Sequence, residues 1–321
     1  EVNALPGQLG LVEQAKPVGR RVPLNGTHGH DANPTASGLS PGSGAQWRDA
    51  TKGVLVSSDH SKRLIVGVDG SHLSNAAVRW AARSAQLRGL DLHLVHALAG
   101  DMPLLGFGAR DDLDPIRRQA QATLEAAKAQ AHAVDPDLTV TTSCQKGFAS
   151  KALVRASTGA AGIVLGTNGH GTLSRASVGA VAQQVATYAK CPVAVIPRES
   201  PAQAEHGAVV VGVDTSTTAR RALQRAFDHA VVRGCALQVV HAWNPRGADN
   251  PARGQSDSWD AYAKEFEAIV DQTLESSRRE HPRTDVAVEV VKGDPRRVLA
   301  DRSADADLVV LGARAAAGFP R

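Results

Sequence analysis

Short runs of apolar residues alternate along this chain with longer segments in which apolar residues recur every three to four positions. The runs are typical of buried parallel strands, and the spaced segments are typical of amphipathic helices. Such alternation favours right-handed parallel crossovers and a doubly wound α/β layer. In the first half of the chain the pattern predicts strands at Leu64–Val68, Leu92–Ala97, Leu138–Cys144, Ile163–Leu165 and Val193–Ile196.

Residues that begin and end helices lie between these runs. Ser71 or Ser74 can cap a helix over Asn75–Arg88, and Gly89 follows its last residue. Further helices are predicted from Asp114 to about Val134, over Ala149–Ser157, and from Gly179 to the residues before Lys190. The expected fold is therefore an open parallel sheet with helices on its faces.

The pattern then restarts, because Val66-Gly67-Val68-Asp69 recurs as Val211-Gly212-Val213-Asp214, an offset of 145 (214 − 69). Repeats at a fixed offset indicate a tandem duplication. We expect two Rossmann-like doubly wound domains, at 61–198 and 208–321, joined by a polar linker at 199–207. Further pairs at an offset of 145 or 146 are Arg88-Gly89 with Arg233-Gly234, His96-Ala97 with His241-Ala242, Gly147 with Gly293, and Leu165-Gly166 with Leu311-Gly312.

The two ends of the chain depart from this pattern. Residues 1–60 are rich in Gly and Pro and have no sustained period, so we expect a disordered lead-in. At the other end, Ala315 stands where the repeat requires the counterpart of Gly169, and the counterpart of Gly179 falls beyond Arg321. We therefore expect a second domain that is truncated at its C-terminal end.

Composition narrows the class of protein. The net charge is +4, aromatic residues make up 3% of the chain, and the basic residues are scattered, which argues against a nucleic-acid surface. The three cysteines have no paired spacing, which disfavours a disulfide framework or a metal site. No apolar run approaches eighteen residues. We expect a cytoplasmic protein with no membrane partner.

The stretch Ala161–Pro197 holds the clearest chemistry. A buried strand ends at Gly166, a loop with Gly169 and Gly171 follows, and Gly179 opens a helix. Glycines in such a loop let backbone N–H groups approach an anion, to which the helix N-terminus adds the positive end of its dipole. The sequence contains no G-x-x-x-x-G-K-[ST], so this is not a P-loop.

The spacing Gly166-x2-Gly169-x9-Gly179 resembles that of the ATP-binding universal stress proteins, as does the opening strand Ile65–Ser71. The resemblance implies a stress-response regulator that binds ATP, with or without Mg²⁺. It also implies that the two domains pack as an internal pseudo-dimer, with homodimers and an unidentified protein partner as further expectations. The nucleotide-binding positions that it implies are Gly67, Asp69, Ala97, Gly166, Gly169, Gly179 and Ala180, with a degenerate second site at Gly212, Asp214, Ala242 and Gly312.

This sequence departs from the family at Ala180, where Ser or Thr is usual, and the change removes one hydroxyl donor to the phosphates. Two other functions remain open: a nucleotide-free interaction or scaffold module of the same fold, and a slow ATP hydrolase. No catalytic or metal-binding set is evident, so we expect a binding protein rather than an enzyme. Asp69 has a competing role as a cap of the following helix, and His96 and His241 are expected to be structural.

Overall fold

The computed structural model describes residues 62–98, 114–167, 178–197, 207–214, 216–243 and 259–313. The expected disordered lead-in over 1–60 and all of the expected linker except Gly207 lie outside the described residues. Within the described ranges no helix combines the length and the apolar character needed to cross a membrane.

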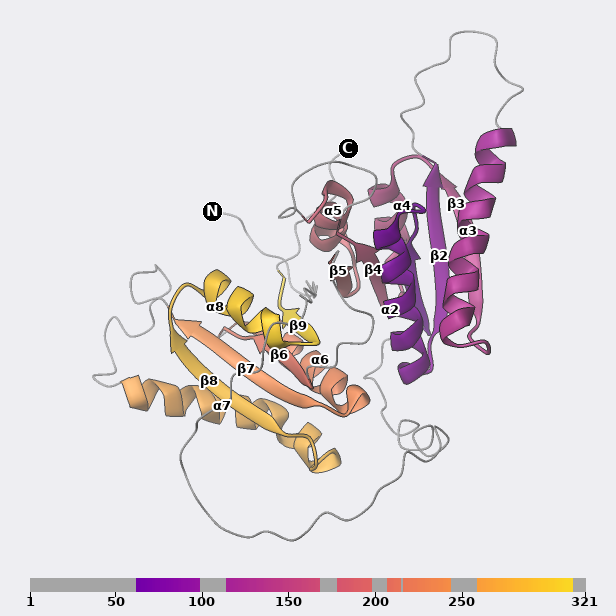
Figure 1. Ribbon diagram of the computed structural model, residues 1–321. Coiled ribbons are helices and arrows are strands. Elements are labelled where there is room, and N and C mark those ends of the chain that lie inside the picture. The colour runs from indigo at the N-terminus through magenta and orange to yellow at the C-terminus, as the bar shows by residue number, and fades with distance from the viewer. Residues whose placement is uncertain are drawn as a thin grey trace.

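The first domain is built on a five-stranded sheet in which all paired strands are parallel (Figure 1). The strand order is β3-β2-β1-β4-β5, so the winding reverses beside β1, as in doubly wound folds. Its elements are β1 (Arg63–Gly67), α2 (His72–Arg88), β2 (Asp91–Leu98), α3 (Asp114–Val134), β3 (Val140–Lys146), α4 (Ala149–Ala156), β4 (Gly162–Gly166), α5 (Ala180–Tyr188) and β5 (Val193–Ile196).

The second domain repeats this order, and its described residues form a four-stranded parallel sheet with the order β8-β7-β6-β9. The two parallel-sheet domains confirm the fold class expected from the sequence. Its elements are β6 (Ala208–Gly212), α6 (Thr217–Arg233), β7 (Ala236–Trp243), α7 (Trp259–Glu280), β8 (Val286–Lys292), α8 (Pro295–Arg302), the 3-10 helix η1 (Ser303–Asp305) and β9 (Leu308–Leu311).

Helices cover both faces of each sheet because the strands are apolar on both sides. In domain 1, Val66 and Leu94 face the alanine-rich helices α2 and α3, whereas Ile65 and Ile163 pack with α4 and α5. The small side chains of α2, such as Ala81, are completely buried and allow the helix to lie close to the sheet. These two apolar layers fix the carboxyl ends of the strands in space.

The predicted element boundaries differ from the structure by a few residues. Helix α2 begins at His72 rather than Asn75, because the hydroxyl of Ser71 accepts a hydrogen bond from the Ser74 N–H and caps the helix there. Gly89 ends it in the left-handed conformation, with φ = 62°. Strand β3 begins at Val140, two residues later than predicted, because Leu138 still belongs to the turn that is bonded to Asp135.

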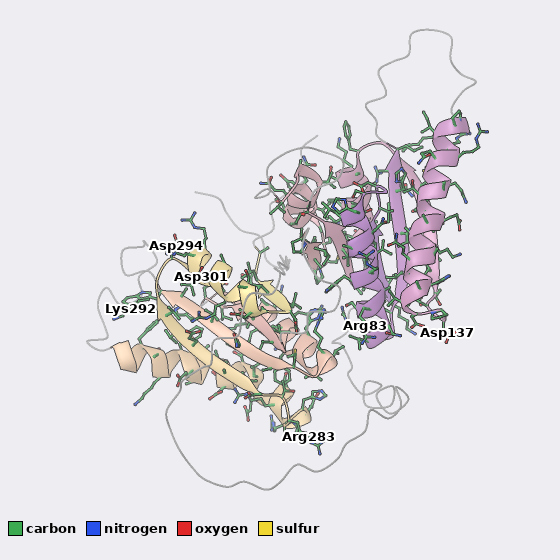
Figure 2. All side chains as sticks on the ribbon, viewed as in Figure 1. Arg83, Asp137, Arg283, Lys292, Asp294 and Asp301 are labelled. Carbon is green, nitrogen blue, oxygen red and sulfur yellow. The ribbon has the colours of Figure 1, made fainter. Side chains whose placement is uncertain are left out.

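Charged side chains lie at both ends of the sheets. Lys292 and Asp294 lie at the carboxyl end of β8, whereas Arg283 precedes β8 at the opposite end, and Asp137 likewise precedes β3 in domain 1 (Figure 2). The Asp294 carboxylate accepts a hydrogen bond from the Arg296 N–H and caps α8. Ligands of open parallel sheets bind at the carboxyl ends of the strands, so a binding site is expected there.

Candidate functional site

The carboxyl ends of the domain 1 strands are held together by backbone hydrogen bonds. The Val68 N–H donates to Val95 O at 2.9 Å, and the Thr167 N–H donates to Ile196 O at 3.0 Å. Parallel pairing places Gly67 of β1 beside Val95 of β2. The ends of β1, β2 and β4 therefore share one edge, and this edge carries the predicted site residues Gly67, Asp69, Ala97 and Gly166.

Asp69 lies half-buried in the turn between β1 and α2. Its Oδ1 atom accepts the Ser71 N–H at 2.9 Å. Ser71, rather than Asp69, supplies the side-chain cap of α2. The carboxylate thus shapes the turn, and a carboxylate has two oxygens that can each accept more than one hydrogen bond.

Ala97 is the penultimate residue of β2 and is half-buried, paired in register with Gln145 of β3. The preceding residue, His96, is turned into the structure: its Nδ1 lies 2.7 Å from Val68 O. This bond ties the end of β2 to the residue that follows β1. The structural role expected for His96 therefore agrees with its hydrogen bond.

Two predicted glycines have a packing reason that the sequence does not reveal. A Cβ atom on Gly67 would lie 2.4 Å from Leu165 Cδ2 and 3.3 Å from Leu153 Cδ1. On Gly166 it would lie 2.9 Å from the carbonyl carbon of Leu73, at the start of α2. Both glycines thus let α4 and α2 lie close to the sheet, and their part in ligand binding stays a prediction.

The strongest local feature is the start of α5. Gly179 is its N-cap residue, with φ = 77° and ψ = 141°, a conformation that residues with a Cβ rarely adopt. Among the described residues no side chain caps this helix, and its first turn, which begins with the exposed Ala180, contains no acidic residue. The N-terminal N–H groups of α5 are therefore available to an anion. Gly169 lies outside the described residues.

The second domain repeats the same edge with the same packing. A Cβ on Gly212 would lie 2.7 Å from Leu311 Cδ2, and one on Gly312 would lie 3.1 Å from the carbonyl carbon of Thr218. The Asp214 Oδ1 atom accepts the Ser216 N–H at 2.9 Å, as Asp69 accepts that of Ser71. Ala242 is the penultimate residue of β7. These four positions of the predicted degenerate site thus keep the geometry of domain 1.

An aromatic cluster distinguishes the two domains, and sequence reasoning missed it. In domain 2, His241 is buried, its Nδ1 lies 2.7 Å from Val213 O, and its Nε2 lies 2.7 Å from the hydroxyl of Tyr262 on α7. Its ring stacks on Phe266, with centroids 4.3 Å apart. Burial lowers the pKa of His241 and raises that of Tyr262.

The corresponding residues of α3, at an offset of 146, are Ile116 for Tyr262 and Ala120 for Phe266 (262 − 146 and 266 − 146). The end of β7 is thus covered by larger side chains than the end of β2. A sequence signal for this cluster was available: Tyr262 and Phe266 lie four residues apart on one helix, in a chain with only 3% aromatic residues.

The comparisons with known proteins agree with this architecture. The model of the universal stress protein family matches residues 60–197 and 206–321. A universal stress protein of Mycolicibacterium smegmatis is 30% identical over 83% of this chain and 91% of its own length, and one of Mycobacterium tuberculosis is 31% identical over 80% and 88%.

Among solved structures, the crystal structure of a universal stress protein from Archaeoglobus fulgidus superposes with a TM-score of 0.57. The superposition covers 75% of this chain and 83% of that chain at 17% sequence identity, which shows that the two proteins share a fold. The family match repeats in tandem, as the internal duplication of the sequence does. The chain belongs to the universal stress protein family.

Proposed function

We propose that the first domain binds an adenine nucleotide, with ATP as the expected ligand, and that the protein acts as a regulator whose state depends on this nucleotide. The observation that carries the proposal is the start of α5, where Gly179 adopts φ = 77° at the carboxyl edge of the sheet and no side chain of the described residues occupies the cap.

The phosphates would lie against the N-terminus of α5. Backbone N–H groups and the helix dipole favour negative charge there, and an acidic residue in the first turn would oppose it. The first turn of α5 contains none. Ala180, the first residue of the helix, offers its backbone N–H but no hydroxyl. We therefore expect phosphate binding that rests on the backbone.

The adenosine end would lie between the turn after β1 and the end of β2. Asp69 offers carboxylate lone pairs to a ribose hydroxyl or to an adenine amine while it holds the Ser71 N–H. Ala97 would contact the base through its backbone, and its small side chain leaves room. Asp69 follows β1 and Ala97 lies near the end of the neighbouring parallel strand β2, at the edge where such sheets bind ligands.

We propose binding and sensing rather than rapid turnover. The histidines at the strand ends support this view, because His96 and His241 use Nδ1 to hold backbone carbonyls, and His241 also uses Nε2 to hold Tyr262. Both nitrogens of the His241 ring are engaged, so this ring is poorly suited to act as a general base, and the Nδ1 bond of His96 positions the end of β2. Occupancy of the site would instead change the surface that a partner protein contacts.

The proposal is tested on the purified chain of 321 residues. A denatured extract is analysed by chromatography for adenine nucleotide, and stripped protein is titrated with ATP by calorimetry. We expect one nucleotide for each chain. If no nucleotide co-purifies and no heat of binding is measured at millimolar ATP, the proposal is wrong and the nucleotide-free scaffold takes its place.

The hydrolase alternative is distinguished by turnover. The release of phosphate from saturating ATP is followed with and without Mg²⁺, at a protein concentration high enough to detect a few turnovers a day. We expect binding without sustained release. A linear release that Gly179→Ala removes would make the protein a slow hydrolase.

A further inference from the structure

The first helix of each domain contacts that of the other domain. Helices α2 and α6 pack together, and the Arg233 guanidinium carbon lies 5.4 Å from the centroid of the Trp80 ring. A cation over an aromatic face is attractive. This contact fixes one side of the junction between the domains.

The internal repeat makes the other side of the junction predictable. At the offset of 145, Trp80 corresponds to Arg225 (80 + 145) and Arg88 corresponds to Arg233 (88 + 145). A junction with approximate twofold symmetry pairs the same two positions twice. The position equivalent to the Trp80–Arg233 contact is therefore occupied by Arg88 and Arg225. An attractive cation–aromatic pair on one side of the junction thus corresponds to two positive charges on the other.

The electrostatics of Arg88 reflect this arrangement. Burial, followed by the positive charge of Arg225, lowers the pKa of Arg88 to about 10. Asp228 opposes this effect, but its own pKa is raised by burial. Within the described part of the chain, the side chain of Arg88 makes no hydrogen bond. Its guanidinium group therefore keeps donors that are half-buried and unmatched.

His229 adds a neutral imidazole ring to the junction beside Arg88. Burial, followed by the charges of Arg88 and Arg233, holds the pKa of His229 well below its ordinary value. Arg88, Arg225 and Arg233 thus carry positive charge around His229, and Asp228 is the one carboxylate among the described groups that shift the pKa of Arg88. Positive groups therefore outnumber negative ones among those that act on Arg88 and His229.

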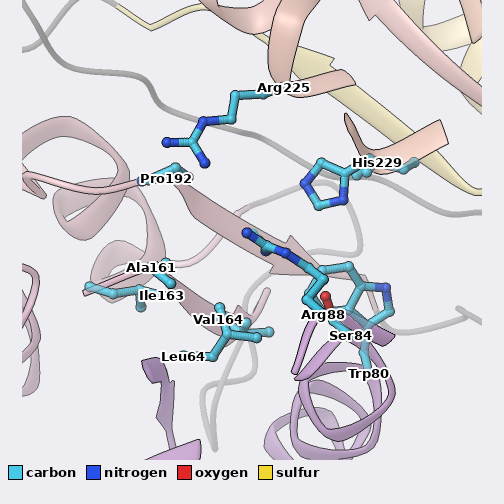
Figure 3. A pocket seen from close by; sticks show the side chains of 13 residues that line it. Leu64, Trp80, Ser84, Arg88, Ala161, Ile163, Val164, Pro192, Arg225 and His229 are labelled. Carbon is cyan, nitrogen blue, oxygen red and sulfur yellow. The ribbon is translucent and has the colours of Figure 1, made fainter. Parts of the chain in front are cut away.

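A cavity of about 30 Å³ opens at this point. Domain 1 lines it with Trp80, Ser84 and Arg88, and domain 2 lines it with Arg225 and His229 (Figure 3). The side chains of Arg88 and Arg225 both extend into the space between the domains. Since one water needs about 10–15 Å³ measured in this way, the cavity admits about two oxygen-sized groups.

We propose that this junction is a binding site for a small oxyanion of the phosphate class, held by Arg88 and Arg225 between the two domains. A guanidinium group binds such an anion through two parallel N–H···O bonds, which requires room for two oxygens. The anion would neutralise the like-charged pair and join α2 to α6. This site lies at the opposite end of β4 from Gly166, since Gly162 lines the cavity, and it is independent of the proposed nucleotide site.

The test uses the full chain with Trp80 as the single tryptophan, after Trp47, Trp243 and Trp259 are replaced by Phe. Emission from Trp80 is followed during titration with sodium phosphate and, separately, with sodium chloride at matched ionic strength. We expect a saturable change with phosphate, a smaller one with acetate, and none with chloride. No saturable change, or the same change with chloride, would overturn the proposal.

Three variants locate the signal. Arg88→Gln is expected to raise the half-saturating phosphate concentration by about tenfold or more. Arg88→Lys keeps the charge but loses the paired N–H donors of the planar guanidinium, so it should raise this concentration by less. Arg79→Gln is the matched control, because Arg79 is exposed on the same helix and bonds Gln130. Gly179→Ala should leave the response intact, so its loss in that variant, or an unchanged response in both Arg88 variants, would contradict the assignment.

Discussion

Asp69 accepts the backbone N–H of Ser71 at 2.9 Å, and the second domain repeats the bond at the same length between Asp214 and Ser216. The two aspartates thus do the same structural work in the two turns. Under the proposed function, only Asp69 also meets a ligand. We therefore expect Asp69→Ala to weaken ATP binding by about tenfold, the equivalent of about one charge-assisted hydrogen bond, measured by calorimetry.

Asp214→Ala is the matched control for this prediction, because it removes the same turn bond from domain 2. It also removes the bond that Asp214 accepts from the Ser216 hydroxyl, so it should lower the free energy of unfolding by at least as much, and it should leave the affinity for ATP unchanged. Equal losses of affinity in both variants would mean that the effect of Asp69 is structural, or that both domains bind nucleotide.

Ala180→Ser restores a hydroxyl at the first position of α5. It should tighten ATP binding by about 0.5–1.5 kcal/mol, because a hydrogen bond to a phosphate oxygen becomes available. Val181→Ser, one residue further along the same exposed turn, should have no such effect. A flat result at position 180 would show that the start of α5 does not face the phosphates.

Gly179→Ala tests the backbone of the site separately from its stability. The φ of 77° strains any residue with a Cβ, so we expect this variant to lose both stability and ATP affinity. Gly89→Ala is the control, because Gly89 also has a positive φ, 62°, and open space around its Cβ position. Gly89→Ala should lose stability alone. If the two variants bind ATP equally well, the start of α5 is not part of the site.

Gly166→Ala should destabilise domain 1 by about 1–3 kcal/mol, since its Cβ would lie 2.9 Å from the backbone of Leu73 and the helix must move away. Gly312→Ala, where the nearest atom is 3.1 Å away in Thr218, should cost domain 2 less. Urea unfolding measures both. No change at Gly166 would contradict the packing assigned to it.

The second domain should lose stability in mild acid. Burial lowers the pKa of folded His241, although the bond to Val213 and the charge of Asp214 oppose this effect. The unfolded chain therefore takes up a proton first, at about pH 6.5, and the free energy of unfolding falls as the pH drops below that value. His241→Gln should reduce this dependence, leaving the part that comes from His229, whose pKa burial also lowers, whereas His72→Gln, at an exposed position, should not change it. An unchanged slope in His241→Gln would refute the assignment.

Local sequence signals predicted the fold because each acts within one element or between neighbouring ones. The apolar run at Ile163–Leu165, the cap at Ser71 and the stop at Gly89 all appear in the structure. The start of β3 was placed too early because the apolar Leu138 extends the pattern into a turn. A preference for strand cannot show that the Leu138 N–H bonds to Asp135.

The site was less accessible to sequence reasoning, because packing contacts are made between distant residues. Gly67 was assigned to a ligand, but the atoms around its Cβ position come from Leu153 and Leu165, on other elements. The contact of Trp80 with Arg233 spans two domains, and no local pattern records it. Gly179 was identified correctly as the start of a helix, because its signal lies in adjacent residues.

The close packing at Gly67, Gly166, Gly212 and Gly312 also affects how such duplicated proteins diverge. Selection for folding alone keeps these four glycines, whether or not a ligand binds. A repeat that ceases to bind would therefore keep these packing glycines while the segment after its fourth strand changes. The glycines packed beneath the helices would therefore reveal common descent. A change of ligand would alter first the positions that correspond to Gly179 and Ala180.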